Sequence, residues 1–548
     1  MRYRVVLTLA GIVLAAGLLA AETVPSHAQN QGGTLRISST ADPDTVDPTL
    51  AGTDTSWWIT FATCAKLFNH PDRSGFAGAE VISEVAKGFP RVSRRGTTQT
   101  IELRRTYRFH DGTPITAANF VAAFNRAAHP KLVLRSYAAV NGYLTDIVGA
   151  GAVMRGKAPA ISGVKARGRY TLEIRTTRPL RDLPARLTMP AFCPIAVDAP
   201  TRETSAPLGS GPYYVAARVP NRQIVLERNT FYRGPRPANA DRVLWSVGLG
   251  QEACLQAVER DTIDYCLGRT RGYGPVPDRQ LAAKYGINRP DGRFFSNATP
   301  QTFYFGFNHD RPAFKSSAQI PLKQAINQAL DRRALARAAG FGEATDQILP
   351  PAMTRAENLY PTQGISSRDL GKARGLLAKT AVMPERLVLY APSDGFFPAW
   401  AQIFQRNLRQ LGLDVTIRYF PFYKIVERAG TRGEPFDVAI SAWSIDYADP
   451  VTFFGPLLNG NNLQAAGNSS LTYFDRPRYN REIERVDRLR GSARRNAWAR
   501  LDVEMMRRDP PWAPVMNGTQ RDFVSESFGC YLFQPVVGHL DLNVACKQ

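Results

Sequence analysis

The sequence predicts a mixed α/β protein, and three observations support this. Stretches in which apolar and polar residues alternate, such as "TQTIELRRTYRF" at 98–109, indicate half-buried strands. Amphipathic stretches such as "PAWAQIFQRNLRQL" at 398–411 indicate helices and fall between strands. The chain has 548 residues, which is too long for a single core, so we expect several domains or one multi-lobed body.

Strand signals dominate the first half of the chain. Thr116 is expected to cap a helix over 114–128, because it precedes an amphipathic run. A helix over 251–260 and a strand over 262–266 complete a strand–helix–strand unit. Asp-Pro pairs mark 39–50 as a turn-rich, extended segment. The other expected strands lie at 32–38, 98–109, 169–177, 207–219, 222–232 and 242–248, of which 207–219 and 222–232 form an antiparallel pair.

The second half is more helical. A helix is expected at 320–330, and Asp331 should cap a second helix that ends at Gly340. A βαβ unit follows, with its parallel strands at 385–391 and 413–420 and the helix at 398–411 between them. A further buried strand is expected at 436–443.

An acid follows this last strand. Asp446 lies between Trp443 and Tyr447, and an ionised carboxylate in such apolar surroundings costs several kcal/mol unless a cation or hydrogen-bond donors compensate. It is therefore strained, paired internally or reserved for a ligand. The internal alternatives are an ion pair with Arg418 or Arg432, or a cap for a helix near "DPVTFF".

The amino terminus predicts export. Residues 1–28 combine two arginines, about fifteen mostly apolar residues and a small-residue cleavage site at "SHA", which is typical of a secretory signal peptide. The alternative is an uncleaved membrane anchor, but the apolar run is short for a span. The first cysteine is Cys64, so there is no cysteine at the predicted cleavage site that could carry a lipid anchor. We expect a periplasmic protein without a lipid anchor.

Six cysteines fit an oxidising compartment. Cys254 on the expected helix and Cys266 on the following strand are the best candidates for a disulfide, and Cys530 with Cys546 is a second plausible pair. Cys64 with Cys193 follows only by elimination. Buried free thiols remain the alternative.

The formal net charge is +22 and is mostly due to arginine. The basic residues are scattered and form no block, and an exported protein does not meet nucleic acid, so we expect no nucleic-acid partner. An arginine-rich solvated surface is the simplest interpretation. Weak attraction to anionic membrane surfaces or anionic solutes is the alternative.

The sequence contains none of the common catalytic or cofactor motifs. It has no G-x-S-x-G elbow, no H-E-x-x-H, no P-loop and no G-x-G-x-x-G that opens a helix. No two of the histidines after the signal lie within one helical turn, so a metal site would have to be assembled in space. We therefore expect no enzyme, no cofactor and no metal.

Six stretches, in order, resemble the successive motifs of the extracytoplasmic solute-binding proteins of family 5, the receptors of peptide and nickel ABC importers. They are "TQTIELRRTYRFHDGTPITAANFVAAF", "PLGSGPYYV", "IVLERNTFY", "FNHDRPAF", "AINQALDRRAL" and "AWSIDYADP". The resemblance covers about 33 to 540, nearly the whole mature chain.

The resemblance implies a periplasmic binding protein fold of type II, cluster C, with two lobes and an extra subdomain in the larger lobe. A base lobe would comprise 29–65, 187–298 and 511–548. The extra subdomain would comprise 66–186, and the second lobe 299–510. The ligand would be enclosed between the lobes without catalysis.

The resemblance also implies site residues. In peptide-binding relatives a tryptophan and an aspartate three residues later place a carboxylate against the ligand's α-amino group, which matches Trp443, Ser444 and Asp446. The backbone from Asp42 to Asp44 would pair with the ligand as an added strand. Tyr423 matches a position for a pocket aromatic. One position that holds the ligand's carboxylate in relatives is Ile440 here, so that anchor is unassigned.

The sequence thus predicts a monomeric receptor that captures a peptide or another amine-bearing solute and delivers it to the transmembrane subunits of an ABC permease. A nickel complex, an opine-like compound or a sugar is the alternative ligand within the same class. A secreted hydrolase of peptides or glycans is the alternative from another class, and stoichiometric rather than catalytic depletion of peptide would separate the two.

Overall fold

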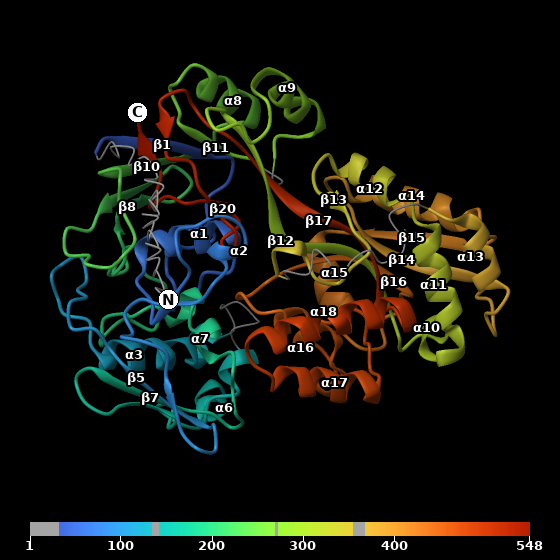
Figure 1. Ribbon diagram of the computed structural model, residues 1–548, viewed down its shortest axis with the longest axis horizontal. Helices are drawn as coiled ribbons and strands as arrows, with labels where there is room; N and C mark the ends of the chain where they lie inside the picture. Colours follow the sequence, from blue (N-terminus) through green and yellow to red (C-terminus); the bar gives the residue numbers. More distant parts are fainter. Residues whose placement is uncertain (1–31, 134–141, 269–271, 354–367) are drawn as a thin grey trace, which may run out of the picture.

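The computed structural model describes residues 32–133, 142–268, 272–353 and 368–548. The expected signal peptide lies outside these residues. Three β-sheets organise the chain, and we name the body around each sheet: the base lobe, the extra subdomain and the second lobe. Figure 1 shows the base lobe and extra subdomain on the left and the second lobe on the right.

The base lobe is built on a five-stranded sheet of order β11-β1-β10-β9-β8. Strand β1 lies between β10 and β11 and is parallel to both. The expected strand–helix–strand unit is β10, α8 and β11, and its two strands flank β1 in the sheet. Strands β8 and β9 form the expected antiparallel pair. The elements are β1 (Thr34–Ser39), α1 (Asp54–Thr63), β8 (Tyr213–Val219), β9 (Gln223–Arg228), β10 (Arg242–Val247), α8 (Gln251–Glu259), β11 (Tyr265–Leu267), α9 (Pro275–Tyr285), β18 (Phe528–Gly529), β19 (Phe533–Gln534), β20 (His539–Leu540) and β21 (Cys546–Lys547).

The extra subdomain has a four-stranded sheet of order β4-β5-β7-β6. Helix α3 begins at a capping box of Thr116 and Asn119, as the sequence predicts for the cap. The elements are β2 (Phe68–Asn69), α2 (Gly75–Gly78), β3 (Ile82–Ser83), β4 (Arg91–Val92), β5 (Thr98–Glu102), α3 (Ala117–Ala127), α4 (Pro130–Val133), α6 (Ala150–Met154), β6 (Val164–Ala166), β7 (Thr171–Arg175) and α7 (Leu183–Arg186). The short helix η1 (Pro190–Phe192) packs against α3 where the chain returns to the base lobe.

One expected strand is shorter than predicted. The alternation over 98–109 predicts a single strand, but β5 ends at Glu102. Arg104, Arg105 and Thr106 are all exposed, so the two-residue period breaks there and the chain turns. The expectation was therefore wrong for the second half of this segment.

The second lobe has a six-stranded sheet of order β13-β17-β12-β16-β14-β15. Strands β14 and β15 are parallel, as the βαβ signal predicts, and β16 is parallel to β14. Asp331 caps α12, which ends at Gly340 in the left-handed region.

The second lobe's elements are β12 (Phe294–Phe307), α10 (Pro312–Lys315), η2 (Ser317–Gln319), α11 (Ile320–Ala329), α12 (Arg332–Ala339), β13 (Glu343–Ala344), η3 (Pro351–Met353), α13 (Leu370–Leu377), β14 (Arg386–Pro392), α14 (Phe397–Arg409), β15 (Asp414–Phe420), α15 (Phe422–Ala429), β16 (Val438–Ser444), α16 (Val451–Leu458), η4 (Gly460–Asn462), α17 (Pro477–Asp487), α18 (Gly491–Arg508) and β17 (Trp512–Phe523).

Strands β12 and β17 connect the two lobes. They pair antiparallel from Phe294 opposite Phe523, in the base lobe, to Gly306 opposite Trp512, in the second lobe. The pairing is irregular midway, where three residues after Ala298 face Gly518 alone. A bulge of this kind bends the ribbon at the passage from one lobe to the other.

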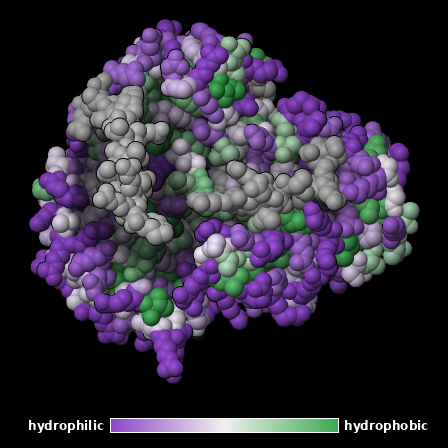
Figure 2. Space-filling view, viewed as in Figure 1, coloured by the Kyte–Doolittle hydropathy of each residue, from purple (hydrophilic) through white to green (hydrophobic). Residues whose placement is uncertain are grey.

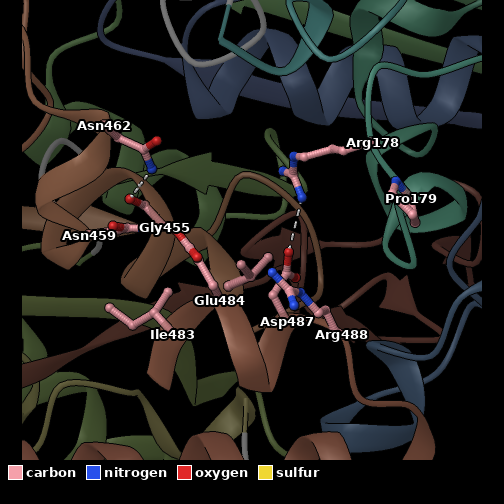
Figure 3. Close-up of a pocket in the computed structure, with 10 residues that line it drawn as sticks. Arg178, Pro179, Gly455, Asn459, Asn462, Ile483, Glu484, Asp487 and Arg488 are labelled. Atoms are coloured by element: carbon pink, nitrogen blue, oxygen red, sulfur yellow. Dashed lines mark hydrogen bonds and ion pairs between the residues drawn. The ribbon is translucent and has the colours of Figure 1, made fainter. Parts of the chain in front are cut away.

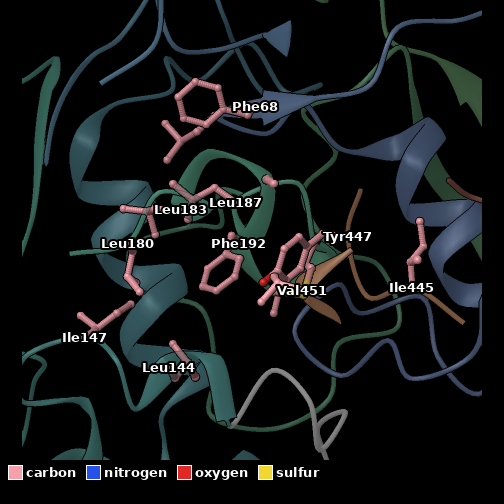
Figure 4. Packing of buried hydrophobic residues seen from close by; sticks show 14 of the residues in the cluster. Phe68, Leu144, Ile147, Leu180, Leu183, Leu187, Phe192, Ile445, Tyr447 and Val451 are labelled. Carbon is pink, nitrogen blue, oxygen red and sulfur yellow. The ribbon is translucent and has the colours of Figure 1, made fainter. Parts of the chain in front are cut away.

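Buried side chains continue from the extra subdomain into the second lobe. Figure 4 shows residues of both bodies in one cluster, with Leu144, Ile147 and Phe192 on one side and Tyr447 and Val451 on the other. Burial of apolar surface therefore contributes to the docking of the second lobe on the extra subdomain.

All three expected disulfides are present: Cys64–Cys193, Cys254–Cys266 and Cys530–Cys546. The second joins α8 to β11, as predicted. The first joins the end of α1 to the chain leaving the extra subdomain, which ties that body to the base lobe.

Candidate functional site

The acid found in the sequence lies just beyond the carboxyl end of β16. Strand β16 is parallel to β14, which is parallel to β15, so the three strands end at the same edge of the sheet. This edge is where α/β sheets commonly bind ligands. The Ile445 amide donates to the carbonyl of Pro300 (3.2 Å), which anchors the start of this loop to the irregular part of β12.

Asp446 is 2% exposed. Its Oδ2 accepts a hydrogen bond of 2.7 Å from the hydroxyl of Tyr143, which belongs to the extra subdomain. Burial raises the pKa of Tyr143 well above its usual value, and the charge of Asp446 adds to this, so the phenol is a neutral donor. A carboxylate offers about four lone-pair sites, so it can accept several hydrogen bonds at once.

The structure excludes two of the internal roles considered for Asp446. The amide of Val451 at the start of α16 donates to Asp449 Oδ1 (2.9 Å), so the acid at the start of this helix is Asp449 and not Asp446. Arg432 pairs with Asp310 at 2.7 Å. The other arginine considered as a partner of Asp446, Arg418, lies on β15, where its register partner on β14 is Tyr390.

The neighbours of Asp446 in the motif have distinct environments. The indole of Trp443 donates to the carbonyl of Thr452 (3.0 Å) and joins β16 to α16. Ser444 is half-buried and pairs with Gln301 of β12. Tyr423 lies in α15, but its side chain is outside the described part of the structure.

Asp42 and Asp44 have structural side-chain partners in the base lobe. Asp42 forms an ion pair with Arg218 (3.0 Å), and Asp44 accepts from the Gly52 amide (2.9 Å) and the Thr53 hydroxyl (2.5 Å). Within the described residues, neither Asp42 nor Asp44 donates its backbone N–H to another backbone group. These side-chain interactions hold the segment in place.

A chain of ion pairs lies beside Asp446, on the extra subdomain. The hydroxyl of Tyr447 donates to Asp182 (2.5 Å), Asp182 pairs with Arg186 (2.9 Å), and Arg186 pairs with Asp146 (2.7 Å). Burial acts to raise the pKa of Asp182, but the Arg186 charge and the Tyr447 hydroxyl outweigh it, so the pKa lies below the usual value. The Arg186 guanidinium also lies 4.9 Å from the centroid of the Tyr143 ring.

The same chain of ion pairs crosses to the second lobe. Arg178 contacts Asp146 at 3.1 Å and reaches Asp487 of α17 at 3.3 Å. Asp487 pairs with Arg494 (2.9 Å), which also pairs with Asp449 (2.9 Å). Alternating charges therefore run between the two bodies beside the candidate acid.

A cavity of about 600 Å³ lies where the extra subdomain meets the second lobe, and we call this contact region the seam. Figure 3 shows Arg178 and Pro179 of the extra subdomain on one side and residues of α16 and α17 on the other, with Arg178 directed at Asp487. The face of the molecule is also hollowed between the base lobe and the second lobe (Figure 2).

Tyr143, Asp182 and Arg186 could not be identified as site residues from the sequence. They lie about 260 to 300 residues before Asp446 and belong to no motif. Ile440, at the position where relatives carry a carboxylate anchor, is fully buried in the core of the second lobe. The Ile440 side chain is therefore not placed to contact a ligand.

In the described residues, no helix is long and apolar enough to cross a membrane. A search of the same residues finds no group of three or more histidine, cysteine or acidic side chains placed to hold a metal ion.

Comparison with known proteins decides the family. The model for "Bacterial extracellular solute-binding proteins, family 5 Middle" matches residues 80–465, which is more than half of the chain. The chain belongs to this family. It is a solute-binding protein and not an enzyme, so that expectation is confirmed, as is the two-lobed α/β fold.

Several relatives of this solute-binding protein are known. The periplasmic murein peptide-binding protein MppA of Escherichia coli (strain K12) is 26% identical over 437 residues, 77% of each chain. The probable D,D-dipeptide-binding periplasmic protein DdpA of the same strain is 24% identical and covers 95% of this chain and 92% of its own. These relatives are periplasmic, which confirms the expected location.

Solved structures of similar proteins have the same fold. "Clavulanic acid biosynthesis oligopeptide binding protein 2" superposes with a TM-score of 0.84 and 25% identity, covering 95% of this chain and 96% of that one. The unliganded open form of MppA superposes with a TM-score of 0.74 at 20% identity, over 94% and 97% of the two chains, and supports the fold alone.

Proposed function

We propose that this protein is the peptide receptor of an ABC importer and that Asp446 binds the ligand's α-amino group. The observation that carries the proposal is the buried carboxylate, placed at the carboxyl edge of the parallel strands within the motif Trp443-Ser444-Ile445-Asp446. A charge-assisted hydrogen bond to an ammonium group compensates the cost of keeping such an acid from water.

The names of the relatives support a peptide. Curated relatives are described as murein peptide-, D,D-dipeptide- and oligopeptide-binding proteins. One structural neighbour was solved with a bound peptide, although at 18% identity it supports only the fold. Among the described residues, no backbone carbonyl accepts from the N–H groups of Asp42 and Asp44, which fits a ligand that binds there as an added strand. Trp443, Ser444 and Tyr423 would border the ligand.

The receptor acts as a monomer, closes around its ligand at the β12–β17 crossing and presents the closed form to the transmembrane subunits of its permease. The division into a base lobe (29–65, 187–298 and 511–548), an extra subdomain (66–186) and a second lobe (299–510) belongs to this proposal. The three sheets support it because each lies within one of these units, apart from β12 and β17, which cross between lobes.

Two measurements test the proposed function. Mass spectrometry of the compound released from the purified protein by mild denaturation should show a short peptide, in about one equivalent and uncleaved. Calorimetric titration should show that the free peptide binds and that its N-acetylated form binds poorly, because acetylation removes the positive charge. Equal affinity for both forms, or release of a nickel complex, opine or sugar, would contradict the peptide assignment.

A further inference from the structure

A second hollow lies on the extra subdomain, away from Asp446. It has a volume of about 540 Å³ and is bordered by the β4–β5 hairpin and the end of β7. Arg94, Arg95 and Arg175 line it together with the hydroxyl side chains of Ser93 and Thr98. Figure 1 shows β5 and β7 at the lower left, and the surface there is mainly hydrophilic in Figure 2.

The backbone brings these side chains together. The Ser93 amide donates to the Thr98 carbonyl (2.8 Å), and the Thr98 amide donates to the Ser93 hydroxyl (3.1 Å), so the hairpin is closed at its base. Gly96 turns the tip with a φ of 76°, a conformation that glycine adopts without strain. Arg175 is the register partner of Thr98 across β5 and β7.

The arginines of this hollow are exposed, and the nearby Glu173, whose charge interacts with Arg175, lies outside the lining. The lining includes three arginines and no acid. Within the described part of the chain, the side chains of Arg94, Arg95 and Arg175 form no ion pair or hydrogen bond. The acids of the same sheet are already paired, Glu102 with Arg91 (2.9 Å) and Glu173 with Arg167 (2.7 Å).

Three guanidinium groups around one space repel one another, and although solvent screens this repulsion, a bound anion lowers it further. Arginine forks and hydroxyl donors match the tetrahedral oxygens of a phosphate group, which accepts several hydrogen bonds and carries up to two charges. The hollow is therefore more than another part of a dispersed basic surface, because a turn and a strand register place its cations around one space.

We propose that this hollow is a binding site for a phosphate group. Arg94, Arg95 and Arg175 bind its oxygens, with Ser93 and Thr98 as further donors. The phosphate comes either from a free anion or from the headgroup of an anionic phospholipid, and both present the same chemistry. The site shares no residue with Asp446 or with the ion-pair chain, so it stands independently of the proposed peptide function.

The test uses a triple variant and a matched control in the full mature chain. The site variant is Arg94→Gln, Arg95→Gln and Arg175→Gln. The control is Arg222→Gln, Arg386→Gln and Arg406→Gln, which removes the same charge from three exposed arginines elsewhere. The probes are inorganic phosphate, followed by calorimetry, and phosphatidylcholine vesicles with and without phosphatidylglycerol, followed by co-sedimentation.

We expect the parent to bind at least one probe, the site variant to bind it on the order of tenfold or more weakly, and the control to stay within about twofold of the parent. Binding of phosphate alone assigns a free anion, and binding only of vesicles with phosphatidylglycerol assigns a lipid headgroup. Equal losses in both variants, or no binding of either probe by the parent, would overturn the proposal. Unchanged circular dichroism of both variants shows that folding is intact.

Discussion

Asp446 and Asp449 lie three residues apart, yet their surroundings indicate different roles. Asp446 accepts a hydrogen bond from a neutral tyrosine across the seam, whereas Asp449 pairs with Arg494 and accepts from the first amide of α16. A carboxylate held for a ligand and a carboxylate held for the fold respond differently when the charge alone is removed. The same substitution at the two positions therefore compares a ligand role with a structural role in one protein.

We predict that Asp446→Asn folds normally and binds peptide about 2 to 5 kcal/mol more weakly, because an enclosed ammonium loses its charge partner. Asp449→Asn should instead lower the free energy of unfolding by up to about 3 to 5 kcal/mol, because Arg494 is left with an incomplete set of acids. Calorimetry and urea denaturation of both variants check this. Peptide affinity at the parent level in a destabilised Asp446→Asn would show that the acid is structural.

Lys66 is a second buried charge with a measurable consequence. Burial lowers its pKa to about 7, and repulsion by Arg236 contributes, although Glu84 opposes the shift. In the unfolded chain its pKa is near 10.5. Between these values the unfolded state holds a proton that the folded state has released, so this group makes stability rise with pH across that window. Below about pH 7 the folded state carries the buried charge at full cost.

Lys66→Met should therefore stabilise the protein at about pH 6, by about 1 to 4 kcal/mol, and the gain should shrink as the pH rises toward 10. The Glu84–Arg236 ion pair (2.8 Å) stays in place in the variant. Melting curves of parent and variant across this range measure the difference. A variant that is less stable at every pH would mean that the lysine makes a favourable interaction that exceeds its desolvation cost.

At the scale of elements, the β12–β17 crossing determines how the lobes are joined. Gly518 faces the three-residue irregularity of β12, and a Cβ at this position would lie 2.5 Å from the hydroxyl oxygen of Thr299. Its neighbour Thr299 is fully buried and the hydroxyl has no hydrogen-bond partner among the described residues. The ribbon is thus closely packed where it must bend.

We predict that Gly518→Ala costs about 1 to 3 kcal/mol of stability through overpacking. Thr299→Ala should cost less, because it removes a hydroxyl without a partner, and it should recover most of the loss when combined with Gly518→Ala. A double-mutant cycle by urea denaturation measures this coupling. Additive losses would show that the two residues do not compete for the same space.

At the scale of the whole molecule, the extra subdomain does more than enlarge the base lobe. It supplies Tyr143 to the candidate acid and joins the second lobe through Arg178, Asp182 and the shared apolar cluster. In the proposed closure, the second lobe would therefore contact this subdomain as well as the ligand. Ion pairs at the seam should make the closed form sensitive to salt.

Arg178→Gln should change stability by less than about 1 kcal/mol, because the side chain is half-exposed, but it should shift the open–closed equilibrium toward the open form. Arg167→Gln is the control, since Arg167 is equally exposed (50% against 49%) and pairs with Glu173 inside the extra subdomain. Small-angle scattering at low and high salt, with and without peptide, measures the opening. The same scattering change in both variants would contradict a specific role for the seam.

Several features followed from the sequence because they depend on neighbours along the chain. The period of apolar residues located β14, α14 and β15, and the caps at Thr116 and Asp331 were predicted from local hydrogen bonding. Helix α8 and strand β11 brought Cys254 to Cys266 over a short span. The strand assigned to 98–109 was too long because consecutive exposed residues ended its alternation.

The sequence by itself determined part of the elements, among them β14, α14 and β15, the best of the disulfides and, through ordered motifs, the family. Only the tertiary structure showed that Tyr143 donates a hydrogen bond to Asp446 and that Arg178 forms an ion pair with Asp487 across the seam. It also showed that Arg175 lies beside the hairpin that carries Arg94 and Arg95. The physical reason is that periodicity shows which face of a helix or strand is buried, but not which other element packs against that face. Contacts between groups hundreds of residues apart follow from strand register and lobe docking, which the energy of the whole fold decides.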